Sequence, residues 1–180
     1  MSKITLILGG ARSGKSSYAL KLAKEAHQPV TFIATAQASD DEMSARIQKH
    51  KAERPAAWQT LELPLLVAPN ISQIKSHVVI LDCVTLWITN LMMPFVNDEL
   101  VDEAPFMQAA QAETKALVAA IRKTEQEWLI VSNEVGLGLV PPYQMGRVYR
   151  DGLGWVNQRL AQEADTVFFM VAGIPMMVKG

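Results

Sequence analysis

The segment that most constrains this chain is residues 4–16, in which an apolar run leads directly into a glycine-rich loop. Residues 4–8 are mostly aliphatic and β-branched, which predicts a buried strand, and residues 9–16 match the pattern G-x-x-x-x-G-K-S/T. The residues after the loop have the spacing of an amphipathic helix. A strand, such a loop and a helix in this order favour a phosphate-binding loop over a chance match to the pattern.

The residue types of the loop have separate physical roles. Gly9 and Gly14 allow the tight backbone turns that let several N–H groups converge on phosphate oxygens. Lys15 brings a cation to the β- and γ-phosphates, the Ser16 hydroxyl can join the coordination of Mg²⁺, and the expected helix adds the positive end of its dipole. The sequence therefore predicts a site for a nucleoside triphosphate with Mg²⁺. Its expected loop contacts are Gly9, Gly10, Ala11, Arg12, Ser13, Gly14, Lys15 and Ser16.

Length and composition narrow the class of protein. A chain of 180 residues can bury one α/β core, so we expect a single domain over residues 1–180. A net charge of −1, with 19% charged residues, gives no basic footprint for nucleic acid. The single cysteine, Cys83, excludes an internal disulfide, and the sequence shows no secretion signal and no apolar run long enough to span a membrane. These features predict a cytoplasmic protein.

Apolar runs alternate with helical periodicity along the chain. Buried strands are expected at 4–8, 30–34, 78–82, 128–132 and 166–172. Helices are expected at 15–26, 40–53, 84–92, 104–126 and 147–163. This alternation predicts an α/β fold with a mostly parallel sheet flanked by helices, whose ligands bind beyond the carboxyl ends of the strands. Residues 61–77 are expected to be irregular and 94–105 to be a solvated excursion, while the large apolar side chains of 86–95 suit either the core or a subunit interface.

Asp82 directly follows a run of four apolar residues. An acid at the end of a strand often caps the next helix, although Thr85 is available for that role here. In P-loop enzymes an acid at this place holds the Mg²⁺ shell. Because the chain also carries a phosphate loop, the metal role is favoured, with Ser16 and Asp82 as the expected metal ligands.

The helix expected at 40–53 carries one histidine, His50, in a basic neighbourhood. His50 shares a stripe with Met43 and Ile47, so it could simply pack against the body of the protein. However, Arg46, Lys49, Lys51 and Arg54 lie within about a turn of it. Nearby cations favour the neutral, nucleophilic imidazole and would hold a polyphosphate beside it. Spacing alone favours the packing interpretation, and only the basic neighbourhood indicates a nucleotide-accepting histidine.

Several strings occur together in this chain and are typical of one family. They are Gly-Gly-Ala-Arg-Ser-Gly-Lys-Ser at 9–16, Ile-Ala-Thr-Ala at 33–36, Asp-Asp-Glu-Met at 40–43, Arg46-Ile47 with His50-Lys51, Arg54-Pro55 with Trp58, Asp82-Cys83, Thr89-Asn90-Leu91, Asn133-Glu134-Val135-Gly136 and Asn157-Gln158-Arg159-Leu160-Ala161. With these strings the chain resembles the bifunctional adenosylcobinamide kinase / adenosylcobinamide-phosphate guanylyltransferase family of cobalamin biosynthesis, from residue 4 to residue 175.

The resemblance implies a RecA-like P-loop fold, a homotrimer and two reactions. In the first, ATP or GTP phosphorylates adenosylcobinamide. In the second, GTP gives GMP to a histidine, which passes it to adenosylcobinamide phosphate to make adenosylcobinamide-GDP. The resemblance places the guanylylated histidine at His50 and implies catalytic roles for His50 and Lys15. Beyond the loop, it implies nucleotide contacts at Ala34, Thr35, Ala36, Lys51, Ala52, Glu53, Arg54, Glu62 and Asp82. The expected nucleotide contact of Glu62 rests on the resemblance alone, because an acid exposed to solvent would have the same sequence context.

Overall fold

A computed structural model describes residues 1–38 and 40–180, with the side chains of all of these except Glu42 and Arg46. Within the described residues the strands form a seven-stranded sheet in the order β3-β2-β4-β7-β1-β8-β9, together with a small hairpin, β5-β6. The strands are β1 (Lys3–Gly9), β2 (Val30–Ala34), β3 (Gln59–Glu62), β4 (Val78–Asp82), β5 (Val96–Asn97), β6 (Leu100–Val101), β7 (Glu127–Val131), β8 (Thr166–Val171) and β9 (Ile174–Lys179). All neighbours in the large sheet pair in parallel except β8 and β9.

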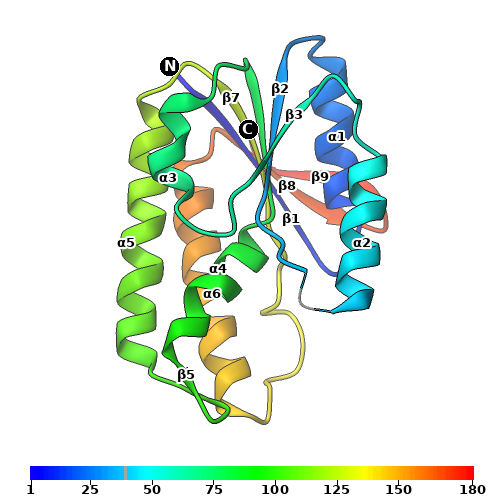
Figure 1. Ribbon diagram of the computed structural model, residues 1–180. Coiled ribbons are helices and arrows are strands. Elements are labelled where there is room, and N and C mark those ends of the chain that lie inside the picture. Colours follow the sequence, from blue (N-terminus) through cyan, green and yellow to red (C-terminus); the bar gives the residue numbers. More distant parts are fainter. Residues whose placement is uncertain (39) are drawn as a thin grey trace.

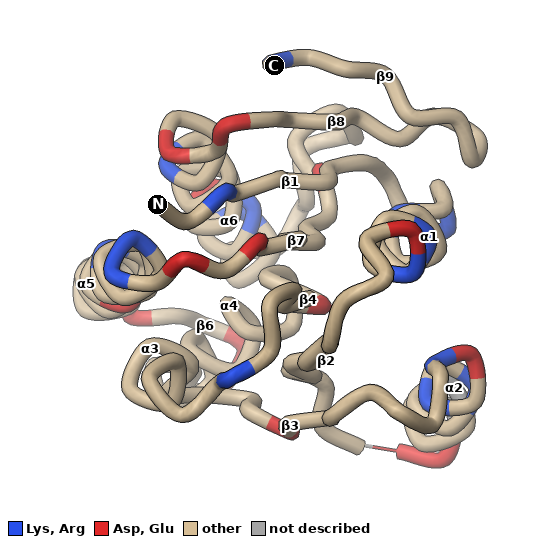
Figure 2. Tube along the Cα trace, turned by 90° about the horizontal axis from the view of Figure 1, so that it is seen from above, with Lys and Arg blue, Asp and Glu red and all other residues tan. Residues whose placement is uncertain are grey.

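Helices cover both faces of the sheet, as Figures 1 and 2 show. The α-helices are α1 (Lys15–Glu25), α2 (Asp41–Ala52), α3 (Val67–Asn70), α4 (Val84–Met92), α5 (Glu103–Arg122) and α6 (Gln144–Glu163), with short 3-10 turns at η1 (Ile71–Gln73) and η2 (Met93–Phe95). Helices α1 and α2 lie on one side, and α3 to α6 lie on the other (Figure 2). This arrangement buries the central strands on both faces, which explains why their sequences are continuously apolar.

Each face of the sheet has its own hydrophobic core. On the side of α3 to α6, Trp87, Phe106 and Trp128 are fully buried. On the side of α1, Ile7, Phe32 and Met170 belong to a smaller cluster. Residues of β1 alternate between the two cores, with Leu6 in the first and Ile7 in the second, as the two-residue period of a strand requires.

The five predicted strands and the five predicted helices are all present, to within a few residues at their ends. The α/β fold with a mostly parallel sheet is therefore confirmed. Helix α2 begins as the sequence indicated, because the Asp40 carboxylate accepts a hydrogen bond of 2.7 Å from the backbone N–H of Met43. Of the residues that the structure describes, none belongs to a helix long and apolar enough to cross a membrane.

One prediction about the connections is wrong, and a second is incomplete. The stretch 61–77 is not irregular, because it contains the end of β3, helix α3 and the turn η1. The stretch 94–105 is not simply solvated, because it contains the β5-β6 hairpin and buries Val101. The amide side chain of Gln144 pairs with both backbone groups of Val101, which holds this hairpin against the start of α6. The elements in these two stretches are only two to four residues long, too short to show a hydrophobic period, which is why the sequence did not reveal them.

The last strand was also not predicted. β9 runs antiparallel to β8 after a turn at Ala172 and Gly173, which have φ values of 49° and 85°. Within 86–95, Trp87, Ile88 and Met92 are buried in the core, whereas Met93 is exposed. Most of that apolar segment therefore serves the core and leaves little for a subunit interface.

Candidate nucleotide-binding site

The phosphate loop joins β1 to α1 through a tight turn. Gly9 (φ 151°) cannot carry a side chain, since a Cβ there would lie 2.6 Å from the Ser13 Oγ and 2.7 Å from the Met170 carbonyl oxygen. Gly14 has a φ of 94° and precedes α1 without a side-chain cap. The first N–H groups of α1 are therefore not taken by a capping side chain, as an anion site at a helix start requires.

Lys15 lies back over its own loop. Its side chain is only 7% exposed, and its Nζ donates a hydrogen bond of 2.6 Å to the Gly10 carbonyl oxygen. Ala11 and Arg12 form the exposed crest of the loop, and Arg12 has a φ of 55°. The predicted loop residues thus form one compact arrangement in which the lysine ammonium lies on the inner side.

Asp82 ends β4 and connects the loop to its surroundings. Its carboxylate lies near Ser16, the other expected metal ligand, whose hydroxyl helps to lower the pKa of Asp82. Burial raises the pKa of Asp82, while the Ser16 hydroxyl, the charge of His50 when it is protonated, and the charges of Arg54 and Lys15 act in the opposite direction. Lys15 and Ser16 belong to α1, His50 lies in α2, and Arg54 lies in the turn after α2. The fold therefore brings predicted site residues from both helices within electrostatic reach of the Asp82 carboxylate.

The pair Ser16 and Asp82 fits a magnesium ion. Mg²⁺ usually takes one or two protein oxygens and fills its other positions with phosphate oxygens and water. A hydroxyl and a carboxylate near each other beside a phosphate loop provide such a donor pair. Across the described part of the chain there is no cluster of three His, Cys, Asp or Glu side chains that could hold a metal without phosphate.

Thr35 has a structural place at the carboxyl end of β2. Its side chain is fully buried, and its hydroxyl donates to the Cys83 carbonyl (2.7 Å) and accepts from the Cys83 N–H (2.9 Å). The Asn90 amide donates to the carbonyls of Thr35 (2.9 Å) and Pro64 (3.0 Å). The Thr35 hydroxyl thus holds the ends of β2 and β4 together, and the expected nucleotide contact of Thr35 stays a prediction. Ala34 is buried and Ala36 is half-buried beside it.

His50 lies in the last turn of α2, with its side chain 36% exposed. Its Nδ1 is 3.9 Å from the Glu53 Oε2, while Ala52 and Glu53 are exposed. The imidazole is half-buried, as are Met43 and Ile47 on the same stripe, so both the packing interpretation and the nucleotide-accepting role of His50 stay predictions. Arg46 was expected to flank His50, and its side chain is not among those that the structure describes.

Two basic residues tie α2 and the turn after it to the sheet. The Lys51 Nζ is 2.5 Å from the Glu62 Oε1, and this contact holds the pKa of Glu62 below its usual range. The Arg54 guanidinium lies over the Phe32 ring, 3.5 Å from the ring centre, and burial lowers the pKa of Arg54. Its Nε and Nη1 are buried with no hydrogen-bond partner among the described residues. Glu62 lies opposite Ala34 in the β2-β3 register, which brings it to the site edge.

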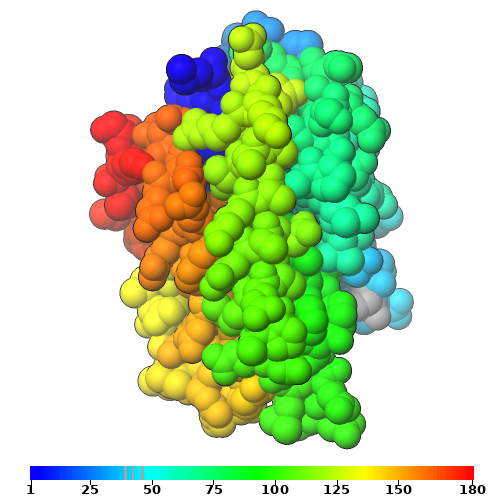
Figure 3. All heavy atoms as spheres, turned by 90° about the vertical axis from the view of Figure 1, so that its left-hand side faces the viewer, coloured from blue at the N-terminus to red at the C-terminus, as the bar shows by residue number. Residues whose placement is uncertain are grey.

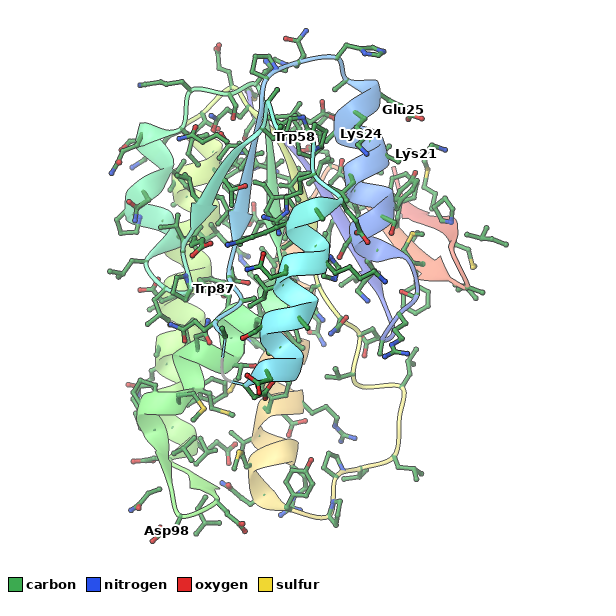
Figure 4. The ribbon with its side chains drawn as sticks, turned by 45° about the vertical axis from the view of Figure 1, so that its right-hand side comes forward. Lys21, Lys24, Glu25, Trp58, Trp87 and Asp98 are labelled. Atoms are coloured by element: carbon green, nitrogen blue, oxygen red, sulfur yellow. The ribbon has the colours of Figure 1, made fainter. Side chains whose placement is uncertain are left out.

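A hollow of about 390 Å³ lies between the end of α2 and β3. It is lined by Lys51, Arg54, Trp58, Thr60 and Glu62, among others, and Figure 4 shows Trp58 just beyond the end of α2. A second, larger hollow of about 510 Å³ lies between α1 and α2, where Lys21, Lys24 and Glu25 are labelled in Figure 4. The first contains three of the predicted nucleotide contacts, whereas the second contains only Glu53.

A polar network behind the loop received little weight in the sequence interpretation. The Ser132 hydroxyl donates to the Asn157 Oδ1 (2.7 Å), and the Asn157 amide donates to the Asn133 carbonyl (2.9 Å). The Asn133 N–H donates to the Thr85 Oγ1 (2.9 Å). Polar residues directly after an apolar strand are the signal that marks this region. The network fixes the end of β7 next to the phosphate loop.

The fold and the site together define a P-loop nucleotide-binding protein of RecA-like architecture. The same fold occurs in the crystal structure of the RadB recombinase, with a TM-score of 0.50 and 10% identity, over 93% of this chain and 73% of that one. The family model described as cobinamide kinase / cobinamide phosphate guanyltransferase matches residues 5–178. The chain belongs to this family and is an enzyme with both of these activities, which confirms the resemblance seen in the sequence.

Characterised relatives match over nearly their whole length. The chain is 45% identical over 177 residues to the bifunctional adenosylcobalamin biosynthesis protein CobP of Pseudomonas aeruginosa, covering 97% of this chain and 96% of the relative. It is 41% identical over 181 residues to the bifunctional adenosylcobalamin biosynthesis protein CobU of Escherichia coli, covering 97% and 98%. The family activities imply ATP or GTP as substrates.

Proposed function

We propose that the two activities proceed through one site and one covalent intermediate. ATP or GTP phosphorylates adenosylcobinamide, and GTP then transfers GMP through His50 to adenosylcobinamide phosphate, giving adenosylcobinamide-GDP within a single domain of residues 1–180. The observation that carries this proposal is the convergence on Asp82 of Lys15 and Ser16 from α1 with His50 and Arg54 from the region of α2. A kinase alone would not need the histidine there.

In the kinase step, the loop from Gly9 to Ser16 would hold the phosphates of the nucleotide through backbone N–H groups and the start of α1. Lys15 would exchange its hydrogen bond to the Gly10 carbonyl for the β- and γ-phosphate oxygens. Ser16 and Asp82 would hold Mg²⁺, which when bound neutralises charge on the phosphate oxygens. The acceptor hydroxyl then attacks the γ-phosphorus and loses its proton to water. The bond from the γ-phosphorus to the β-γ bridging oxygen breaks, with its electrons going to the departing ADP or GDP.

In the guanylyltransferase step, His50 would be the nucleophile. In this proposal the proton of the neutral imidazole lies on Nδ1, which is 3.9 Å from the Glu53 Oε2, and the lone pair lies on Nε2. Nε2 attacks the α-phosphorus of GTP, a P–N bond forms, and the bond to the bridging oxygen breaks with its electrons going to pyrophosphate. A phosphate oxygen of adenosylcobinamide phosphate then attacks the same phosphorus, and the P–N bond breaks to restore His50.

The hollow between α2 and β3 suits the remainder of the nucleotide. Arg54 presents buried N–H donors without described partners, and Lys51 and Glu62 form an ion pair that can rearrange around a polar ligand. We propose that Ala34, Thr35, Ala36, Lys51, Ala52, Glu53, Arg54 and Glu62 form the wall of this site, with Thr35 acting through the backbone that it holds.

The test is incubation with GTP labelled at the α-phosphate, followed by denaturing electrophoresis. Wild type should retain an acid-labile label and His50→Ala should not, while His27→Ala, which changes an exposed histidine at the end of α1, should label like wild type. Residual phosphorylation of cobinamide by His50→Ala, with none by Lys15→Ala, would separate the two reactions. Absence of label from the wild type at saturating GTP would overturn the covalent intermediate.

We also propose a homotrimer. The exposed apolar side chains of β9, which include Ile174, Met176, Met177 and Val178, give an edge strand that a second copy could cover. Light scattering should give three times the mass of the chain, and a monomer across the working concentration range would refute this assembly.

A further inference from the structure

The connection between β7 and α6 carries large apolar side chains that contact little of the protein. Leu137 is 82% exposed, Leu139 97%, Val140 62% and Tyr143 61%. Figure 3 shows this part of the chain in yellow at the lower edge of the molecule, beside the start of α6. Side chains of this kind gathered on one exposed segment usually mark a surface that a ligand or a partner covers.

The first end of this segment is anchored on the phosphate loop. The backbone N–H of Glu134 donates a hydrogen bond of 3.0 Å to the carbonyl oxygen of Gly9, the first residue of the loop motif. The Glu134 carboxylate in turn accepts from the N–H of Gly136, which closes a turn at this point. The apolar residues therefore begin directly after the place where β7 meets the loop.

The other end is held against the first turn of α6. The Arg147 Nη1 donates to the carbonyls of Pro141 (3.1 Å) and Pro142 (2.8 Å). A Cβ added at Gly146 would lie 2.6 Å from the Tyr143 ring and 2.8 Å from Pro141, so the glycine leaves room for both to pack on the helix. The segment is thus a shelf of defined position, and we call residues 134–143 the β7-α6 shelf.

We infer that the β7-α6 shelf is the docking surface for the corrin macrocycle of cobinamide. This inference rests on the proposed function. In-line transfer requires the acceptor hydroxyl to lie within about 3.5 Å of the γ-phosphorus, so the body of the acceptor must rest on a surface that borders the phosphate loop. The shelf is such a surface, since it starts at Gly9 and extends outward.

The two sides of the phosphate loop carry different kinds of side chain, which supports one surface for the nucleotide and another for the corrin. The flank toward α2 and β3 offers charged groups, Lys51, Arg54 and Glu62, which suit a nucleotide. The β7-α6 shelf leads to α6, which lies on the opposite face of the sheet from α2 (Figure 2), and it offers aliphatic and aromatic groups. A corrin macrocycle is large, with a rim of methyl groups and amide arms, so an apolar shelf with free edges fits it.

The experiment compares Leu137→Ser/Leu139→Ser with Leu137→Met/Leu139→Met in the kinase assay. Both leucines are exposed, so neither variant should affect folding. The serine variant should raise the KM for cobinamide at least tenfold, and the methionine variant should stay within about twofold of wild type. The KM for the nucleotide and the α-phosphate labelling of His50 should not change in either variant. Leu65→Ser/Leu66→Ser, on the exposed connection before α3, controls for the loss of exposed apolar surface.

An unchanged KM for cobinamide in the serine variant would overturn the inference. If light scattering then gave a smaller mass for that variant, the shelf would be a contact between copies of the chain instead. A wild type that phosphorylates no cobinamide would refute the proposed function, whereas an active wild type with an unaffected serine variant would refute only the docking surface.

Discussion

The Arg54 guanidinium lies on the ring of Phe32, with its central carbon 3.5 Å from the ring centre. Phe32 belongs to β2, and Arg54 follows the end of α2, so this contact positions the end of the histidine-bearing helix over the sheet. One face of the guanidinium is covered by the ring, and its Nε and Nη1 are buried without described partners. An arginine held in this way is pre-oriented for a phosphate or another anion.

We expect Arg54→Met to weaken GTP binding about tenfold or more, because the variant loses a charge-assisted donor pair in a half-buried site. Phe32→Leu should weaken binding by a smaller factor, since the charge remains but its platform is lost. Titration calorimetry with GTP measures both effects. Lys21→Met removes one exposed cation from the neighbouring helix and controls for net charge. GTP affinity in Arg54→Met equal to that of the control would contradict this role.

Thr35→Val should lower the free energy of unfolding by about 1–3 kcal/mol, because the backbone N–H and carbonyl of Cys83 lose their partner in a buried position. Thr35→Ser keeps the hydroxyl and should lose about 1 kcal/mol or less. Urea unfolding of the two variants checks the difference. Equal losses in both would mean that the methyl group, rather than the hydrogen-bond pair, is what stabilises the protein here.

Two glycines in α6 should respond to alanine in opposite directions. A Cβ at Gly152 would lie 2.7 Å from the Phe106 ring of α5, so Gly152→Ala should destabilise by about 1–3 kcal/mol through overpacking. Gly154 has nothing within 4 Å of such an atom, so Gly154→Ala should stabilise by up to about 1 kcal/mol through helix propensity. Thermal unfolding of both variants measures the two effects. Destabilisation by Gly154→Ala would disprove the predicted gain from helix propensity.

Asp165 should make stability depend on pH. The Ile4 N–H donates to its carboxylate (2.7 Å) and, with Arg122 nearby, holds the pKa of Asp165 below its ordinary value. The ionised group therefore stabilises the fold fully above the ordinary pKa of an aspartate, and this contribution is lost as the pH falls through the lowered native value.

Asp165→Ala should therefore lower the free energy of unfolding by about 1 kcal/mol at pH 7. This is a small value for a hydrogen bond to a charged group, because Asp165 is exposed. The gap to the wild type should narrow as the pH is lowered toward the acid limit of folding. Urea unfolding across that range is the measurement, with Asp151→Ala, an exposed acid beside Arg150, as the control. A gap that stays constant with pH would show that the charge of Asp165 is not responsible.

The sequence predicted the elements that are buried on both sides and missed those that are not. Strands such as β4 and β7 are continuously apolar because helices cover both faces, and that pattern can be read directly. β3 has an exposed, polar sequence at the edge of the sheet, and β9 is apolar but exposed along its whole length. Their pairing depends on neighbours far away in the chain, which local periodicity does not reveal.

The same distinction applies to the candidate site. The phosphate loop and Asp82 could be predicted because a local motif and a strand end define them. The Lys51–Glu62 ion pair and the contact of Arg54 with Phe32 depend on how α2 and the turn after it pack on β2 and β3. No spacing in the sequence encodes that packing. The hydrogen bonds of the buried Thr35 hydroxyl to Cys83 join the ends of β2 and β4, and no pattern in the sequence indicated this supporting role.

The turn between β8 and β9 also bears on the phosphate loop. The Gly173 N–H donates a hydrogen bond of 3.0 Å to the Ser13 carbonyl, and the Gly173 Cα would lie 3.1 Å from a Cβ at Gly14. The C-terminal hairpin thus acts as a brace for the loop, although β9 contributes no buried side chain to either core. Proteolytic cleavage within β9 should therefore lower nucleotide affinity while the rest of the domain remains folded.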